Sequence, residues 1–240
     1  MEKIVIQLAG INISVACLFQ ETYTYLSEFK TKNKGKYEVG ISELRFIQER
    51  TILEQKIPWK KFYDYEIEIN ALYHELSLLL LREDVIVIHG VLLRMKNVGI
   101  LFTAPSGIGK STQAALWVEH FPNDVVIING DKPLLKITEE GVVAFGSPWK
   151  GKEKIGNKEC VPLKKICYVR RAKENSIKLV EWNGDSLSWL LTQSQLYESQ
   201  NSTIERVRLF KKAIPFVSLY ELKCNISDMA VITAYDGFFK

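Results

Sequence analysis

The sequence contains no long hydrophobic run. Its longest apolar stretches, at 76–81 and 85–88, fall far short of the ~20 residues that a membrane-spanning helix needs. Gln7, Asn12 and Ser14 interrupt the apolar stretch near residue 1, so we expect no targeting segment there. These patterns predict a protein that has no membrane partner and works in the cytoplasm.

Cysteine, proline and glycine are also scarce. The four cysteines are far apart and include no CxxC pair, which excludes the usual zinc ligand sets and a disulfide framework. We therefore expect reduced thiols, as in the cytosol. With 14 glycines, 7 prolines and 47% hydrophobic residues, the chain is too apolar to be mainly disordered.

Neither sign of charge dominates. The 32 basic and 28 acidic residues leave a net charge of +4, which is too small to predict a nucleic-acid partner without a clustered basic face. The 240 residues are enough to bury roughly 70–75% of the unfolded surface without a metal or disulfide. Function must therefore be sought in a site.

The apolar pattern predicts two parts. Residues 1–65 are expected to form a small β-rich N-terminal segment, with strands at 3–8 and 11–18 around Gly10 and another within 37–47. From residue 66 the apolar period becomes that of a helix, which we expect over 66–82 at the start of a second domain, 66–240.

The second part alternates between strand and helix patterns, as an α/β core does. Arg170 and Arg171 are expected at the surface, where a strand ends. The expected strands are 85–90, 98–103, 125–129, 165–170, 176–181 and 215–222, and the expected helices are 111–121, 185–197, 202–213 and 227–235.

A glycine-rich loop follows the apolar strand at 98–103. Its residues APSGIGKS (104–111) match GxxxxGK(S/T) with alanine at the first glycine. The two glycines let successive N–H groups face inward, and the start of the next helix adds its positive dipole. The pattern predicts an ATP-binding loop, with Lys110 on the β- and γ-phosphates and the Ser111 hydroxyl on Mg²⁺. Its predicted residues are Ala104, Pro105, Ser106, Gly107, Ile108, Gly109, Lys110, Ser111 and Thr112.

The order of three motifs resembles the HPr kinase/phosphorylase family, which shares its nucleotide core with ATP-dependent phosphoenolpyruvate carboxykinase. The motifs are HGVL (89–92), SGIGKS (106–111) and GD (130–131), and the close match covers 85–131. The resemblance implies a P-loop core of the same kind, an α/β fold with a mixed sheet and flanking helices. It also implies an ATP- and Mg²⁺-dependent kinase that phosphorylates a hydroxyl, expected to be a serine of a peptide or protein.

Two features depart from that family. Its members carry paired aspartates after the strand that follows the loop, whereas residues 129–132 are NGDK. Its arginine-glycine signature loop is missing, and FGSPWKGKEKIG (145–156) stands in its place. The chain is more similar to the shorter HPr-kinase-related proteins encoded with ribosomal peptide clusters, which implies a ribosomally made precursor peptide as acceptor, as in lasso-peptide tailoring.

Three residues are expected to carry the chemistry. Asp131 follows a predicted strand, where α/β folds bind ligands, and it suits either a base for the acceptor hydroxyl or a ligand of Mg²⁺. The resemblance favours the base, and we expect Ser111 and Asp131 near the metal. His89 is expected at the end of a strand, where it could orient the acceptor or tune Asp131. Lys110 completes the catalytic set.

The loop at 145–156 is a candidate substrate loop. Its lysines are suited to meet phosphate or an acidic substrate. The residues expected to contribute are Gly146, Trp149, Lys150, Gly151 and Lys152.

Several alternatives stay open. The chain could be a catalytically inactive nucleotide-binding module that regulates a partner, a kinase of a small hydroxylated metabolite, or a P-loop ATPase. A homo-oligomer is also open.

Overall fold

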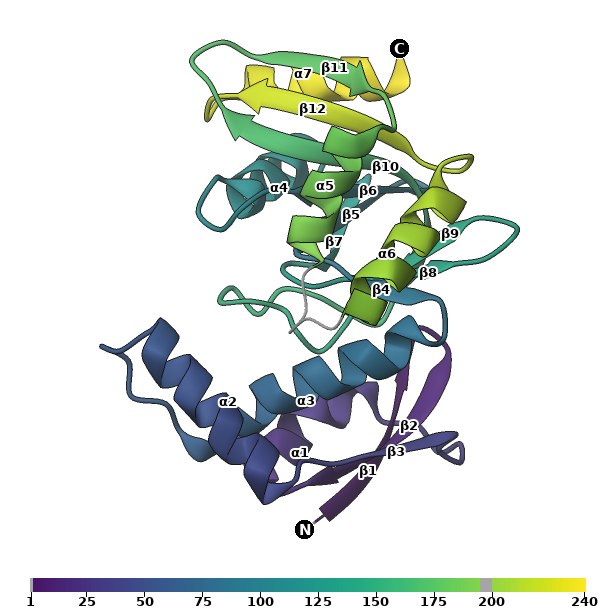
Figure 1. Ribbon diagram of the computed structural model, residues 1–240. Helices are drawn as coiled ribbons and strands as arrows, with labels where there is room; N and C mark the ends of the chain where they lie inside the picture. The colour runs from purple at the N-terminus through teal and green to yellow at the C-terminus, as the bar shows by residue number, and fades with distance from the viewer. Residues whose placement is uncertain (1, 195–199) are drawn as a thin grey trace. The chain divides into compact units, whose positions relative to one another are not determined.

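The chain divides between Glu83 and Asp84 into two units, each with its own sheet. The computed structural model describes residues 2–194 and 200–240 (Figure 1). No helix in this part of the chain is long and apolar enough to cross a membrane.

The first unit joins a three-stranded sheet to helices. Strands β1 (Glu2–Leu8) and β2 (Ile11–Cys17) form a hairpin, and β3 (Tyr37–Val39) pairs with β2 in parallel. The hairpin turn needs left-handed backbone at Ala9 and Gly10, with φ of +48° and +81°, which suits the predicted turn glycine. Every second residue of β2 is buried, so one face of the sheet contributes to the core.

Helices fill most of the rest of this unit. They are α1 (Gln20–Leu26), the short 3₁₀ turn η1 (Ser27–Phe29), α2 (Glu43–Lys56) and α3 (Asp64–Leu81). The strand expected within 37–47 is therefore confined to three residues, and a 14-residue helix follows. Ser42 explains that change, because its hydroxyl accepts from the N–H of Arg45 and caps α2.

Helix α3 confirms the helix predicted over 66–82, but this helix belongs to the first unit. It packs against α1 and α2, and Leu53, Phe62 and Ile67 form an apolar cluster between α2 and α3. Its buried Glu68 also accepts from the N–H groups of Leu18 and Phe19 at the start of α1, at 2.6 and 3.2 Å. The structural boundary thus falls 18 residues after the expected one, because this helix completes the small sheet's core.

The second unit is built on a nine-stranded mixed sheet. Seven strands follow the order β4-β8-β9-β10-β6-β5-β7, and β12 extends from β10 and pairs with β11. Among the described residues of this sheet, the pairs β10–β6 and β10–β12 are parallel and the other pairs are antiparallel. The strands are β4 (Val85–Val87), β5 (Gly90–Met95), β6 (Val98–Thr103), β7 (Val125–Asn129), β8 (Leu134–Ile137), β9 (Val142–Phe145), β10 (Cys160–Arg171), β11 (Ser176–Val180) and β12 (Ser218–Cys224).

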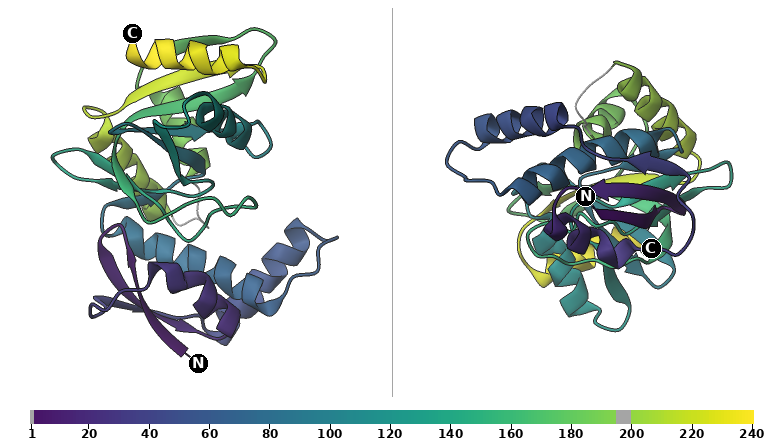
Figure 2. Two further views of the ribbon diagram at one scale, coloured as in Figure 1. Left: turned by 180° about the vertical axis from the view of Figure 1, so that it is seen from behind. Right: turned by 90° about the horizontal axis from the view of Figure 1, so that it is seen from below.

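Helices cover both faces of this sheet. Helices α4 (Lys110–His120) and α7 (Asp228–Phe239) lie on one face, and α5 (Gly184–Gln193) and α6 (Gln200–Ala213) on the other (Figures 1 and 2). Trp117 of α4 is fully buried and contacts Phe102 of β6 and Phe238 of α7. Two-sided burial explains why β6 is almost wholly apolar. The end of the helix expected over 185–197 lies outside the described residues.

One expectation about the sheet was wrong. The stretch 85–90 is not one strand, since β4 ends at Val87 and a new strand starts at Gly90. The strands before and after the glycine-rich loop are not neighbours, because the antiparallel β5 lies between β6 and β7. Both β6 and β7 run against β5, so they still share a direction, as a βαβ unit requires.

Candidate active site

Three chain segments meet at one edge of the large sheet. Since β5 runs against both neighbours, its first residue lies at the end where β6 and β7 finish, and Gly90 pairs with Thr103. The hydroxyl of Thr103 donates to the carbonyl of His89 at 2.8 Å, and the N–H of Gly90 donates to the carbonyl of Asp131 at 2.8 Å. The order of strands therefore brings the glycine-rich loop, His89 and Asp131 to the same edge.

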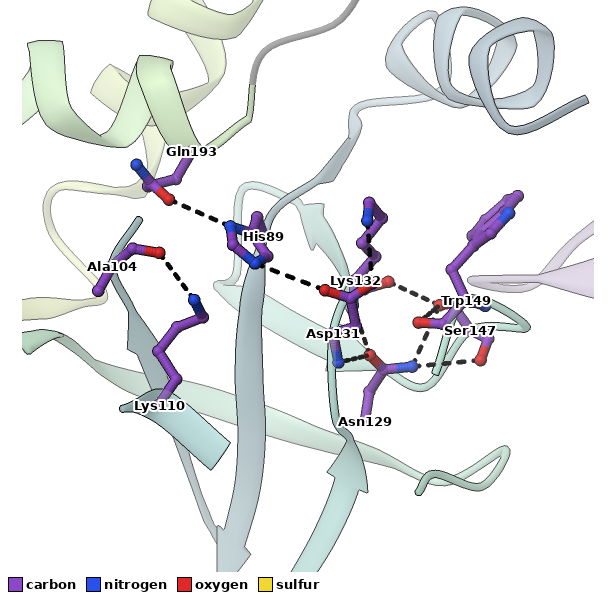
Figure 3. A network of polar contacts seen from close by, with 9 residues as sticks. All are labelled: His89, Ala104, Lys110, Asn129, Asp131, Lys132, Ser147, Trp149 and Gln193. Carbon is purple, nitrogen blue, oxygen red and sulfur yellow. Dashed lines mark hydrogen bonds and ion pairs between the residues drawn. The ribbon is translucent and has the colours of Figure 1, made fainter. Parts of the chain in front are cut away.

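The glycine-rich loop has the backbone that its glycines predict. Gly107 and Gly109 lie at φ of +80° and +122°, in the region that favours glycine. Lys110 is 7% exposed. Its ammonium donates to the carbonyl of Ala104 at 2.8 Å (Figure 3) and to that of Pro105 at 3.2 Å. The lysine thus folds back across the loop that precedes it, with its charge inside the curve.

The loop ends in the first turn of α4. That helix begins at Lys110 with no side chain capping its start, so its first N–H groups have no intrahelical acceptor. Ser111 and Thr112 are exposed in this turn. This end of the helix suits a bound anion for three reasons. It has the free amides of the first turn, the positive end of the helix dipole and the nearby Lys110 ammonium.

Asp131 stands in a tight turn after β7. Its Oδ1 lies 3.5 Å from Nε2 of His89, and its Oδ2 lies 2.9 Å from the ammonium of Lys132 (Figure 3). Asn129 is fully buried and fixes this turn, because its Oδ1 accepts from the N–H groups of both Asp131 and Lys132 at 3.0 and 2.7 Å. The amide of Asn129 donates in turn to the carbonyl and hydroxyl of Ser147.

His89 is held from its other side by Gln193, the last residue of α5. The backbone N–H of His89 donates to the backbone carbonyl of Gln193 at 2.8 Å. In the side chains, Nδ1 of His89 lies 3.3 Å from Oε1 of Gln193. The Gln193 amide donates to the hydroxyl of Thr192, which directs Oε1 toward the imidazole. With Nδ1 donating to that oxygen, a neutral ring presents its Nε2 lone pair to Asp131. Nε2 and the carboxylate can then share one proton.

The electrostatics of the site favour the neutral imidazole. Burial lowers the pKa of His89, and the Lys110 charge adds to this, whereas Asp131 opposes it. Burial also lowers the pKa of Lys110, against the effect of Asp131. Both basic groups therefore respond to the Asp131 carboxylate. Among the sequence-predicted residues, the structure thus brings together His89, Lys110 and Asp131.

We expect the pKa of His89 in the nucleotide-free protein to lie below its ordinary value of 6.5. Lys110, Asp131, Lys132 and Gln193 are the groups that face it. The unfolded chain then binds the proton first as the pH falls, so the free energy of unfolding decreases below about pH 6.5. An NMR titration of the imidazole, assigned with His89→Gln, measures this pKa. A midpoint above 6.5 would contradict the expectation.

The candidate substrate loop lies along the Asp131 turn. The N–H of Lys132 donates to the carbonyl of Trp149 at 3.2 Å, and that of Gly130 to the carbonyl of Ile155 at 3.0 Å. A Cβ on Gly151 would stand 3.0 Å from Cβ of Asp131, so the backbone passes directly beside this residue. Trp149 itself is buried, whereas Gly151 and Lys152 are exposed.

The oxygen donors of the site suit a magnesium ion that arrives with a nucleotide. In the described part of the chain, no group of three or more His, Cys, Asp or Glu side chains could hold a metal. Asp131 has one carboxylate oxygen paired with Lys132, whereas the Ser111 hydroxyl is exposed. Mg²⁺ binds readily through phosphate oxygens and water, so Ser111 would be its protein ligand and Asp131 would act through water.

Four residues of the site were not predicted from the sequence. Ser147 and Gln193 act through hydrogen bonds between segments distant along the chain, whereas Asn129 bonds both within its own turn and to Ser147. Arg171, expected only as a surface residue, contacts the glycine-rich loop. Of these, only Asn129 carried a signal, because an Asn two residues before Asp131 is typical of a side chain that caps a turn.

Comparisons with known proteins assign no function to this chain. No protein-family model and no curated protein matches the sequence. Among solved structures, the Hpr(Ser) kinase/phosphatase from Coxiella burnetii is similar, with a TM-score of 0.34 and 10% identity. The similarity covers 62% of this chain and 94% of that one.

Proposed function

We propose that the protein is an ATP- and Mg²⁺-dependent kinase that transfers the γ-phosphoryl group to a hydroxyl. The observation that carries this proposal is the meeting of two features at one sheet edge. One is a glycine-rich loop with a buried lysine folded inside it. The other is the Asp131 carboxylate, whose charge acts on both Lys110 and His89. An anion cradle beside a proton acceptor is what phosphoryl transfer to a hydroxyl requires.

In the proposed reaction the acceptor oxygen attacks the γ-phosphorus. The new O–P bond forms as the bond from that phosphorus to the β,γ-bridging oxygen breaks, and ADP leaves with the bond's electron pair. The hydroxyl proton passes to Asp131 Oδ1, where the Nε2 lone pair of His89 can share it. Lys110 and the loop amides offset the charge on the phosphates, so most of the rate enhancement comes from positioning and electrostatics. The magnesium ion bound with ATP supplies further neutralisation of phosphate charge.

A serine of a peptide or protein is the proposed acceptor, and a ribosomally made precursor peptide is the proposed source. The exposed Gly151 has its backbone beside Asp131, so an acceptor chain bound along this loop would meet the base. A cytoplasmic location accords with the use of ATP and with the four free cysteines, Cys17, Cys160, Cys167 and Cys224.

A nucleotide-binding regulatory module is the second candidate. The observation that favours it is the ion pair between Lys132 and Asp131 at 2.9 Å. An ammonium occupies the position next to the carboxylate where the related kinases carry a second aspartate. In such a module the loop would bind ATP, but the γ-phosphoryl group of ATP would not be transferred.

Incubation with γ-labelled ATP, Mg²⁺ and an array of serine peptides tests the proposal. Each peptide is paired with its Ser→Ala counterpart, and free serine and glycerol represent small hydroxylated acceptors. We expect label on serine peptides and none on their alanine partners.

Other outcomes identify the alternatives. Label only on small acceptors would make the protein a metabolite kinase. Release of phosphate without any acceptor would make it an ATPase. Calorimetric binding of ATP with no transfer and no release would support the regulatory module.

A further inference from the structure

Arg171 lies beside the glycine-rich loop, on the strand next to β6. The last pair between β10 and β6 is Tyr168 with Thr103. β10 continues for three more residues, so Arg171 is level with the loop that leaves β6. Its Nε donates to the carbonyl of Ile108 at 3.0 Å, and its Nη2 donates to the carbonyl of Gly107. The two arms of one guanidinium thus hold two successive peptide carbonyls.

These contacts decide which way the loop amides face. In a trans peptide the C=O of one residue and the N–H of the next point in opposite directions, and the chain has no cis peptide among its described residues. With the carbonyls of Gly107 and Ile108 turned toward Arg171, the N–H groups of Ile108 and Gly109 point away from it. Gly109 directly precedes the first turn of α4, so its amide joins the helix amides that an anion would meet.

We infer that Arg171 is a positioning residue that organises the glycine-rich loop for the nucleotide's phosphates before they bind. The inference rests on the proposed function, because it assumes that the loop binds a nucleotide. Only a planar guanidinium carries donors spaced to span two adjacent carbonyls, so lysine is a poor substitute. The loop glycines are then already ordered in the free protein. Nucleotide binding therefore does not include the entropic cost of ordering them.

Arg170 provides a matched control. It precedes Arg171 on the same strand, is also exposed, and pairs with Glu221 of β12 at 2.6 Å, away from the loop. Replacing either arginine with glutamine removes one positive charge from the same place along the chain. A general loss of attraction for ATP would therefore affect both variants alike, whereas loss of loop positioning would affect only one.

The experiment measures ATP binding by calorimetry for wild type, Arg171→Gln, Arg171→Lys and Arg170→Gln. We expect Arg171→Gln to weaken ATP binding about tenfold, which corresponds to about 1.4 kcal/mol, and Arg170→Gln to change it less than about twofold. Arg171→Lys should fall between them. Hydrogen exchange of the backbone amides at 106–112, without nucleotide, should be faster in Arg171→Gln only. In phosphoryl transfer, KM for ATP should rise while kcat at saturating ATP stays near that of wild type.

Each other result overturns the inference in a distinguishable way. Equal binding by wild type and Arg171→Gln refutes the positioning role and leaves the proposed function intact. An equal loss in Arg170→Gln assigns the effect to charge. Weaker binding with unchanged hydrogen exchange means that Arg171 contacts the nucleotide directly. Failure of the folded wild type to bind ATP refutes the proposed function and this inference together.

Discussion

Replacing Lys110 with alanine is expected to lower phosphoryl transfer at least 100-fold and to weaken ATP binding. Removal of one preorganised charge or donor from a water-excluded site commonly costs about 10²–10³ in rate. Lys110 is the buried cation of the loop, and its ammonium already sits among the carbonyls of Ala104 and Pro105. Transfer from γ-labelled ATP and calorimetric titration with ATP measure the two effects.

Two further variants separate function from folding. Lys110→Met keeps the aliphatic stem of the side chain and removes only the ammonium, so it should fold like wild type and still lose transfer. Lys164→Ala removes one positive charge from an exposed position on β10 and should change neither quantity. Undiminished transfer by a folded Lys110 variant would refute the assignment of this loop.

The local parts of the site could be predicted from the sequence because their signals are local. The glycines at 107 and 109 are needed for a positive φ, and the structure shows φ in that region at both. Ala104 fits the first glycine position because this fully buried residue does not lie in the left-handed region. The apolar runs before and after the loop likewise became β6 and β7.

The arrangement of strands could not be predicted in the same way. Short apolar runs do not reveal their partners, so nothing in the sequence indicated that β5 separates β6 from β7. The helix over 66–82 was predicted from its period, but a period does not reveal which sheet a helix covers. Its packing against α1 and α2 places it in the first unit.

The residues that support the site depend on contacts between distant segments. Gln193 lies 104 residues from His89, and Arg171 lies 63 from Ile108. A glutamine in a helix and an arginine at the end of a strand have no sequence pattern that sets them apart. Lys110 and Asp131 could therefore be singled out from the sequence as candidates, whereas the residues that orient these groups required the fold.

Replacing Asp131 with asparagine is expected to reduce kcat by about 10²–10⁴ and to leave ATP binding within a few-fold of wild type. General-base catalysis contributes about that much, and an amide has nearly the shape of the carboxylate without its proton affinity. The turn should persist, because Asn129 holds it through the backbone N–H groups of residues 131 and 132. Single-turnover transfer from γ-labelled ATP, alongside calorimetry, measures both quantities.

Asp124→Asn is the matched control, since this exposed carboxylate directly precedes the same strand, β7, and its loss should leave kcat unchanged. The pair of variants also separates the two candidate functions. A kinase loses turnover at Asp131 while it still binds ATP, whereas a regulatory module has no turnover to lose and shows ATP binding alone. Full transfer by Asp131→Asn would remove this residue from the reaction, and His89, which shares the edge, would be the next base to test.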